Sequence, residues 1–336
     1  MQIIRYPPIY LSTLQKPKIL RGYPRYLRFP LRSNSFSFMD STKAEEVDYN
    51  LAPAIQISKN GGVERILGTK RVPALLDAVT RVSSKDAIID PRSGLSARLY
   101  LPKIIDLNEK LPLLIYLHGD GFVTDSTFFP LYRNYLSSLV SQGNIVFVSV
   151  DYKLSPEYSL PIGHDDFWEI IRWVFSASNK ESWLRGYRDF DREFLVGDSA
   201  KANLSHKILL QAKDDDKVNM LGVVNMYFWG TKRIGSEDAA NHSPFNMSLM
   251  TNLWTTAYQT SKGIDGPRNN PFSQETPSLS GLACEQVLIS VAKKYVVKDR
   301  GLFYYETLEK SGWRCKFEIE ETKEENHVFH LYNPTC

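Results

Sequence analysis

Ser199 occupies a position in which a serine hydroxyl can act as a nucleophile. It is the centre of the pentapeptide Gly197-Asp198-Ser199-Ala200-Lys201. The strand-like segment Glu193–Ser199 precedes the helix-like segment Ala200–Ala212, so Ser199 is expected on a sharp turn between them. Such a turn presents the hydroxyl at the end of a sheet, and its crowded backbone requires small neighbours. A Gly-x-Ser triplet is frequent by chance, so a purely structural serine is the alternative interpretation.

A glycine-rich segment follows another apolar strand-like run, Leu111–Gly119. Its sequence is His118-Gly119-Asp120-Gly121-Phe122. Glycines allow a backbone to approach a substrate closely, and N–H groups there can stabilise the oxyanion that forms when a hydroxyl attacks a carbonyl. The alternative is an ordinary glycine-rich turn. The strand on one side and Phe122 on the other favour an oxyanion loop.

His327 is the candidate general base. It lies near the end of the chain, after the last strand-like segment, in the sequence Glu325-Asn326-His327-Val328-Phe329-His330. A neutral imidazole at this place could take the proton of the Ser199 hydroxyl. His330 is the rival candidate, but His327 is nearer to the end of the preceding strand.

Strand-like and helix-like segments alternate along the chain, and the strands are short, apolar runs of the kind found in buried parallel sheets. This alternation predicts an α/β fold with a mostly parallel central sheet and helices on both faces, and the order serine before histidine matches the α/β-hydrolase fold. A long stretch, residues 231–280, is expected to be irregular and to cover a site. The predicted strands are Asp86–Ile89, Leu95–Tyr100, Leu111–Gly119, Asn144–Tyr152, Glu193–Ser199, Gly222–Phe228, Gln286–Ala292 and Lys316–Glu321, and the predicted helices are Phe128–Ser141, Asp165–Ser176, Ala200–Ala212 and Asp299–Ser311.

Positive charge is concentrated at the N-terminus. Residues 1–38 contain seven Lys or Arg residues and no Asp or Glu, so the rest of a chain with net charge +3 carries −4. We therefore expect residues 1–38 to lie outside the fold, either as an organelle transit peptide or as residues before a translation start at Met39. Residues 39–336 are expected to form one domain. The protein is predicted to be cytoplasmic, or chloroplastic if residues 1–38 are a transit peptide.

The composition excludes several classes of protein. A net charge of +3 is too small to indicate nucleic-acid binding. The three cysteines lack metal-ligand spacing, and the chain has no apolar run of about eighteen residues, so neither a metal site nor a membrane span is expected. No cofactor is expected either.

Taken together, these segments make the chain from about Ala52 to Cys336 resemble the plant carboxylesterases, relatives of hormone-sensitive lipase and of the gibberellin receptor. The matching segments are His118–Phe122, Val150–Glu157, Asp165–Trp168, Asp189–Arg192, Gly197–Asn203, Lys298–Gly301, Ser311–Trp313 and His327–His330. The resemblance implies an α/β-hydrolase with a small N-terminal cap that cleaves small-molecule carboxylic esters. It also implies a further C-terminal helix, which this sequence lacks.

The resemblance assigns roles to individual residues. Ser199 becomes the nucleophile and His327 the general base. The oxyanion donors become the backbone N–H groups of Asp120, Gly121 and Ala200. The acid that would orient His327 is expected in the loop after Gln286–Ala292, at the position that Tyr295 holds.

Three positions depart from the family pattern. Tyr295 replaces the acid, a loss that lowers kcat by about 10⁴ in serine proteases, and Asp299 is the alternative acid. Asp120 brings a carboxylate into the oxyanion loop, and Lys201 replaces the second glycine of the nucleophile turn. We hypothesise that Asp120 and Lys201 form an ion pair. An ester hydrolase is the predicted function, and a degenerate relative that binds a small molecule without efficient turnover is the alternative.

Overall fold

The computed structural model describes residues 47–51, 54–177, 181–226, 244–258, 266–268, 270, 273, 275–294 and 298–332. The chain divides into two compact units, residues 1–45 and 46–336, and only the second contains described residues. The predicted N-terminal extension, residues 1–38, lies outside the described residues, so its boundary stays a prediction.

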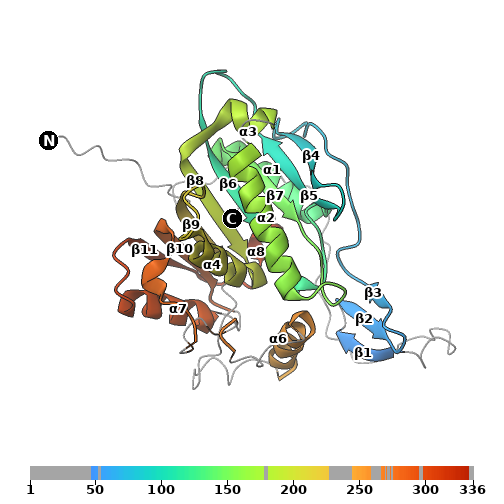
Figure 1. Ribbon diagram of the computed structural model, residues 1–336. Coiled ribbons are helices and arrows are strands. Elements are labelled where there is room, and N and C mark those ends of the chain that lie inside the picture. Colours follow the sequence, from blue (N-terminus) through green and yellow to red (C-terminus); the bar gives the residue numbers. More distant parts are fainter. Residues whose placement is uncertain are drawn as a thin grey trace. The chain divides into compact units, whose positions relative to one another are not determined.

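An eight-stranded central sheet forms the middle of the second unit (Figure 1). Its strand order is β11-β10-β9-β8-β6-β7-β5-β4. The five pairs from β11 to β7 are parallel, whereas β5 pairs antiparallel with both β7 and β4, so the mostly parallel sheet is confirmed. The strands are β4 (Ser83–Asp90), β5 (Leu95–Leu101), β6 (Leu111–Leu117), β7 (Val146–Asp151), β8 (Arg188–Asp198), β9 (Met220–Met226), β10 (Cys284–Ala292) and β11 (Lys316–Thr322).

Helices cover both faces of this sheet (Figure 1). The core is divided into two hydrophobic clusters, one on each face of the sheet, because neighbouring residues of one strand point to opposite faces. Tyr116 belongs to a smaller cluster with residues of α1 and α8, whereas Ile115 belongs to a larger cluster with residues of α2, α4, α6 and α7. The helices are α1 (Pro130–Gly143), α2 (Leu160–Ala177), α3 (Ser182–Tyr187), α4 (Ala200–Ala212), α6 (Pro244–Ala257), α7 (Lys298–Lys310) and α8 (Phe329–Tyr332).

A separate antiparallel sheet precedes the central one. It consists of β1 (Val47–Leu51), β2 (Ile55–Ser58) and β3 (Val63–Arg65). Arg65 at the end of β3 reaches two loops of the main sheet: its Nε donates to the carbonyl oxygen of Val123 at 2.9 Å, and its guanidinium binds both carboxylate oxygens of Glu157 at 2.7 Å. This bidentate ion pair holds the small sheet against the loops that follow β6 and β7.

The expectation of an irregular stretch over residues 231–280 is wrong for its middle, where α6 forms. The buried apolar residues of α6 lie three and four positions apart, at Met250, Leu253, Trp254 and Ala257, which is the spacing of one helix face. The many Asn, Ser and Thr residues of the segment concealed this spacing. The short helix α3 was also not predicted. Among the described residues, no helix has the length and apolar character needed to cross a membrane.

Candidate active site

Ser199 lies on a strained turn between β8 and α4. Its backbone has φ 53° and ψ −118°, a conformation that a residue other than glycine adopts only when the surrounding structure enforces it. The turn is too tight for a side chain at Gly197, because an added Cβ would lie 2.6 Å from the carbonyl oxygen of Lys201 and 2.8 Å from the Cα of Ala202. This backbone conformation directs the Ser199 side chain away from the strand, at the carboxyl end of the sheet.

His327 contacts the Ser199 hydroxyl directly. The distance from Ser199 Oγ to His327 Nε2 is 2.7 Å, although 128 residues separate the two along the chain. His327 follows β11 and lies two residues before the start of α8. Burial lowers the pKa of His327 to about 4, and the negative charge of Asp198 opposes that shift only in part. The imidazole is therefore neutral near pH 7 and has a lone pair available for the serine proton.

The predicted oxyanion loop leaves β6 and forms the single turn η2 (Asp120–Phe122). Three consecutive residues, Asp120, Gly121 and Phe122, have φ between 63° and 73°, in the left-handed region. An added Cβ at Gly121 would lie 2.9 Å from Cδ1 of Leu253 in α6, so that side chain would have to shift, and the left-handed backbone itself favours glycine.

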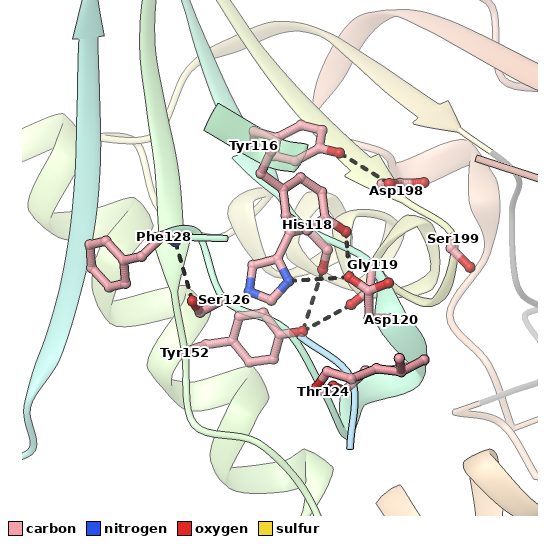
Figure 2. Close-up of polar contacts among 12 residues, drawn as sticks. Tyr116, His118, Gly119, Asp120, Thr124, Ser126, Phe128, Tyr152, Asp198 and Ser199 are labelled. Atoms are coloured by element: carbon pink, nitrogen blue, oxygen red, sulfur yellow. Dashed lines mark hydrogen bonds and ion pairs between the residues drawn. The ribbon is translucent and has the colours of Figure 1, made fainter. Parts of the chain in front are cut away.

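Gly119 brings this loop against the nucleophile turn. A Cβ there would lie 3.2 Å from both the carbonyl oxygen of Asp198 and the Cβ of Ser199. On the other side of the loop, the Tyr152 hydroxyl donates to the carbonyl oxygens of Gly119 at 3.2 Å and His118 at 3.4 Å (Figure 2). The Tyr152 ring also stacks on the His118 ring, with 4.5 Å between centroids. Tyr152 therefore stabilises the loop through its hydroxyl and through ring stacking.

The Asp120 carboxylate is embedded in a polar cluster. The Tyr132 hydroxyl donates to Asp120 Oδ2. His118 Nδ1 lies 3.9 Å from the same oxygen (Figure 2). Burial alone would raise the pKa of Asp120, but its polar neighbours His118, Asp125 and Tyr132 lower it below its usual value. Burial and the charge of Asp120 raise the pKa of Asp125 to about 9. The two carboxyl groups thus carry one negative charge near neutral pH, with the proton on Asp125.

Comparison with known proteins identifies the family. A family model described as an alpha/beta hydrolase fold matches residues 114–331. Probable carboxylesterase 2 of Arabidopsis thaliana is 43% identical over 303 residues, which cover 89% of this chain and 94% of that protein. The chain belongs to the plant carboxylesterase family. It is a carboxylesterase-type α/β hydrolase.

Other plant carboxylesterase relatives differ in the reactions that their names record. Tuliposide A-converting enzyme 1 of Tulipa gesneriana is 39% identical, and the match covers 89% of this chain and 77% of that protein. A 2-hydroxyisoflavanone dehydratase of Glycyrrhiza echinata is 36% identical, with coverages of 89% and 94%. Among solved structures, a thermostable esterase from Pseudomonas putida has the same fold, with a TM-score of 0.63 at 20% identity over 75% of this chain and 76% of that one.

Lys201, where the carboxylesterase pattern has glycine, points into a cage of aromatic rings. Its side chain is fully buried, and its Nζ lies 3.8 Å from the centroid of the Phe122 ring and 3.9 Å from that of Tyr152. Within the described part of the chain, Nζ has no hydrogen-bond partner. The hypothesis of an Asp120–Lys201 ion pair is therefore wrong, because Lys201 Nζ contacts aromatic rings and not the Asp120 carboxylate. The aromatic rings take up the long side chain that this turn was not expected to accommodate.

A polar network that the sequence did not reveal lies behind the Ser–His pair. Asp198 is fully buried, and the Tyr116 hydroxyl donates to its Oδ2 at 3.0 Å (Figure 2). His330 Nε2 lies 3.5 Å from the same oxygen. The rival histidine, His330, thus contacts the residue before the nucleophile rather than the nucleophile itself. One sequence signal could have indicated this contact. Asp198 directly precedes Ser199, and His330 lies three residues after His327, so the contact between Ser199 and His327 also brings Asp198 near His330.

The expected acid position lies outside the described residues, because Tyr295 is not among them. Its assignment stays a prediction. Asp299, the alternative acid, lies in the first turn of α7.

We predict that Lys201→Met stabilises the protein, and more so at pH 7 than at pH 9.5. Burial, partly opposed by the charge of Asp120, holds the pKa of Lys201 well below its usual range. Between that lowered pKa and the ordinary value of about 10.4, the unfolded chain binds more protons than the folded one, so the stability of the wild type rises with pH by up to about 1.4 kcal/mol per pH unit. Methionine fills the cage without this dependence.

Urea denaturation of both proteins at the two pH values measures the effect. Lys217→Met is the matched control, because Lys217 is exposed and its replacement leaves the pH dependence of the free energy of unfolding unchanged. Equal pH dependence in the wild type and Lys201→Met would show that Lys201 is not held in an uncharged environment.

Proposed function

We propose that this chain hydrolyses carboxylic esters with Ser199 as nucleophile and His327 as general base. The observation that carries the proposal is the 2.7 Å contact between Ser199 Oγ and His327 Nε2, at a strained turn between strand and helix. Ser199 Oγ attacks the ester carbonyl while His327 takes its proton. The protonated imidazole returns that proton to the departing alcohol, which leaves an acyl group on Ser199. Water activated by His327 then releases the acid and regenerates the serine.

The backbone N–H groups of Asp120, Gly121 and Ala200 are the proposed donors to the oxyanion. Two features support this role. Gly119 lies against the nucleophile turn, which sets the loop beside the N-terminus of α4, and the left-handed backbone of Asp120 to Phe122 is an unusual conformation that the surrounding packing maintains. Donors held rigidly in this way stabilise a developing charge without reorganising during the reaction.

The proposed substrates are esters of small molecules, in line with the names of the carboxylesterase and esterase relatives. The negative charge of Asp120 weakens the stabilisation of an oxyanion, which is the observation that favours the alternative of a poor catalyst that mainly binds its ligand. The hydrogen bond from the Tyr132 hydroxyl to Asp120 Oδ2 reduces this effect, because it partly neutralises the charge on that oxygen.

Ser199→Ala is expected to reduce the hydrolysis of p-nitrophenyl acetate by the purified protein to the level of the uncatalysed reaction plus a small residual. Ser138→Ala is the control, because among the described residues the Ser138 hydroxyl bonds only with Gln142, on an exposed part of α1. His327→Gln should match Ser199→Ala, whereas His330→Gln should retain part of the activity. Equal activity of the wild type and Ser199→Ala would refute the proposal.

Tyr295→Asp is expected to raise kcat by orders of magnitude if the absent acid limits the reaction. In the wild type, kcat/KM should fall only as the pH drops through about 4, since burial lowers the pKa of His327 to about 4 and its base form persists down to that value. An added carboxylate stabilises the imidazolium, so it should move this acidic limb to higher pH. Tyr295→Phe is the control. If Tyr295→Asp changed neither kcat nor the limb, Tyr295 would not occupy the acid position.

The location of the protein in the cell is a separate proposal. The cytoplasm was the first expectation, but the alternative, a plastid, gains support from relatives named chloroplastic and amyloplastic. One of these, a tuliposide A-converting enzyme b1, aligns with 98% of this chain, a span that includes most of the basic N-terminal residues. We expect residues 1–38 fused to a fluorescent protein to enter plastids of plant cells, and the fusion of residues 39–336 to stay in the cytoplasm. Cytoplasmic fluorescence from both fusions would contradict the plastid proposal.

A further inference from the structure

A second cavity lies along α4, apart from the Ser199–His327 pair. Its volume is about 350 Å³, and its described lining includes neither of those two residues nor any residue of the oxyanion loop. Five residues of α4 line it, at positions three and four apart, so they share one face of the helix: Asn203, His206, Lys207, Leu210 and Gln211. The opposite wall comes from His164 in α2 and from the segment that contains Pro267 and Arg268.

The polar lining of this cavity is basic. Lys207 Nζ lies 5.9 Å from the centroid of the Tyr258 ring, and the Arg268 guanidinium carbon lies 5.0 Å from the same centroid, so two cations gather at one ring. Within the described residues, neither cation has an ion-pair partner. The nearby Asp166 pairs with Lys153 at 3.2 Å, and the side chain of Asp165, 3.8 Å from His164 Nδ1, is 85% exposed.

The ionisation of these groups reflects first their burial and then their mutual repulsion. Burial and the charge of Arg268 lower the pKa of Lys207 to about 7. Burial, then Lys207, and more weakly Arg268 lower the pKa of His164, against the opposing charge of Asp165. A bound anion would relieve this repulsion and restore the charge of Lys207.

Asn203 is an independent indication of a ligand. Its side chain is 1% exposed, and neither its Oδ1 nor its Nδ2 has a hydrogen-bond partner within the described part of the chain. Buried amides in folded proteins are nearly always hydrogen-bonded. An unsatisfied amide in the wall of a cavity is therefore a group that a ligand can satisfy.

We propose that this cavity binds a small organic acid, with its carboxylate between Lys207 and Arg268 and within reach of the Asn203 amide. Arginine and lysine together with an amide N–H are the donors that carboxylates prefer. Leu210 and Pro267 supply an apolar wall for the body of the acid, and the volume lies in the range of ordinary ligand pockets. The proposal does not depend on the function assigned to Ser199.

Calorimetric titration of the full chain with benzoate tests the proposal, with neutral benzamide as a control of the same shape. We expect saturable binding of benzoate at low salt and binding of benzamide that is weaker by about tenfold or more, because only the acid forms charge-assisted hydrogen bonds. At pH 8, titrations in Tris and in HEPES should differ in heat, because the complex takes up a proton as Lys207 regains its charge.

Lys207→Met and Arg268→Gln should each weaken benzoate binding by about tenfold, whereas the exposed Lys217→Met should not change it. Arg268 is also exposed, so Arg268→Gln is expected to keep the fold. Benzoate bound at the Ser199 site would be unaffected by either pocket variant. Absent binding, equal affinity for benzamide, or equal benzoate affinity in both pocket variants and the wild type would overturn the proposal.

Discussion

The contact between two backbone segments, the turn at Ser199 and the loop at Gly119, is the constraint on which the site depends. A Cβ at Gly119 would crowd the carbonyl oxygen of Asp198 and the Cβ of Ser199 at 3.2 Å, and both segments have backbone angles that are unfavourable in isolation. Packing must supply the stabilisation that these conformations lack. The parallel pairing of β6 with β8 does so, because it fixes the two strand ends side by side.

The two faces of the sheet contribute differently to this support. On the face covered by α1 and α8, the hydroxyls of two buried tyrosines reach the carboxylates near the site: Tyr116 binds Asp198 and Tyr132 binds Asp120. On the other face, aromatic rings surround Lys201 beneath the loop. On both faces, therefore, aromatic residues pack against apolar neighbours and also contact a buried charged or ionisable group.

Much of this could be predicted from the sequence, because local signals were strong. Short runs such as Val146–Asp151 are apolar and β-branched, which fixes them as buried strands, and Ser199 stands at a strand–helix junction whose glycine is visible in the sequence. The helix α6 was missed because its apolar spacing lies among many polar residues. The environments of Asp120 and Lys201 could not be predicted. Opposite charges suggested an ion pair, but the choice between that pair and an aromatic cage depends on tertiary packing, which no local pattern encodes.

The aromatic cage at Lys201 has a consequence for how this sequence can vary. A lysine that is fully buried against Phe122 and Tyr152 is acceptable only while those rings are present, and Tyr152 also tethers the loop through its hydroxyl. Replacing either ring would leave the Lys201 amine in a buried space without a hydrogen-bond partner. If position 201 were glycine, the same replacement would remove only packing contacts. The effect of a substitution at 122 or 152 is therefore conditional on the residue at 201. These three positions form an epistatic unit, and a change from glycine to lysine at 201 is accessible only to a sequence in which both rings are already in place.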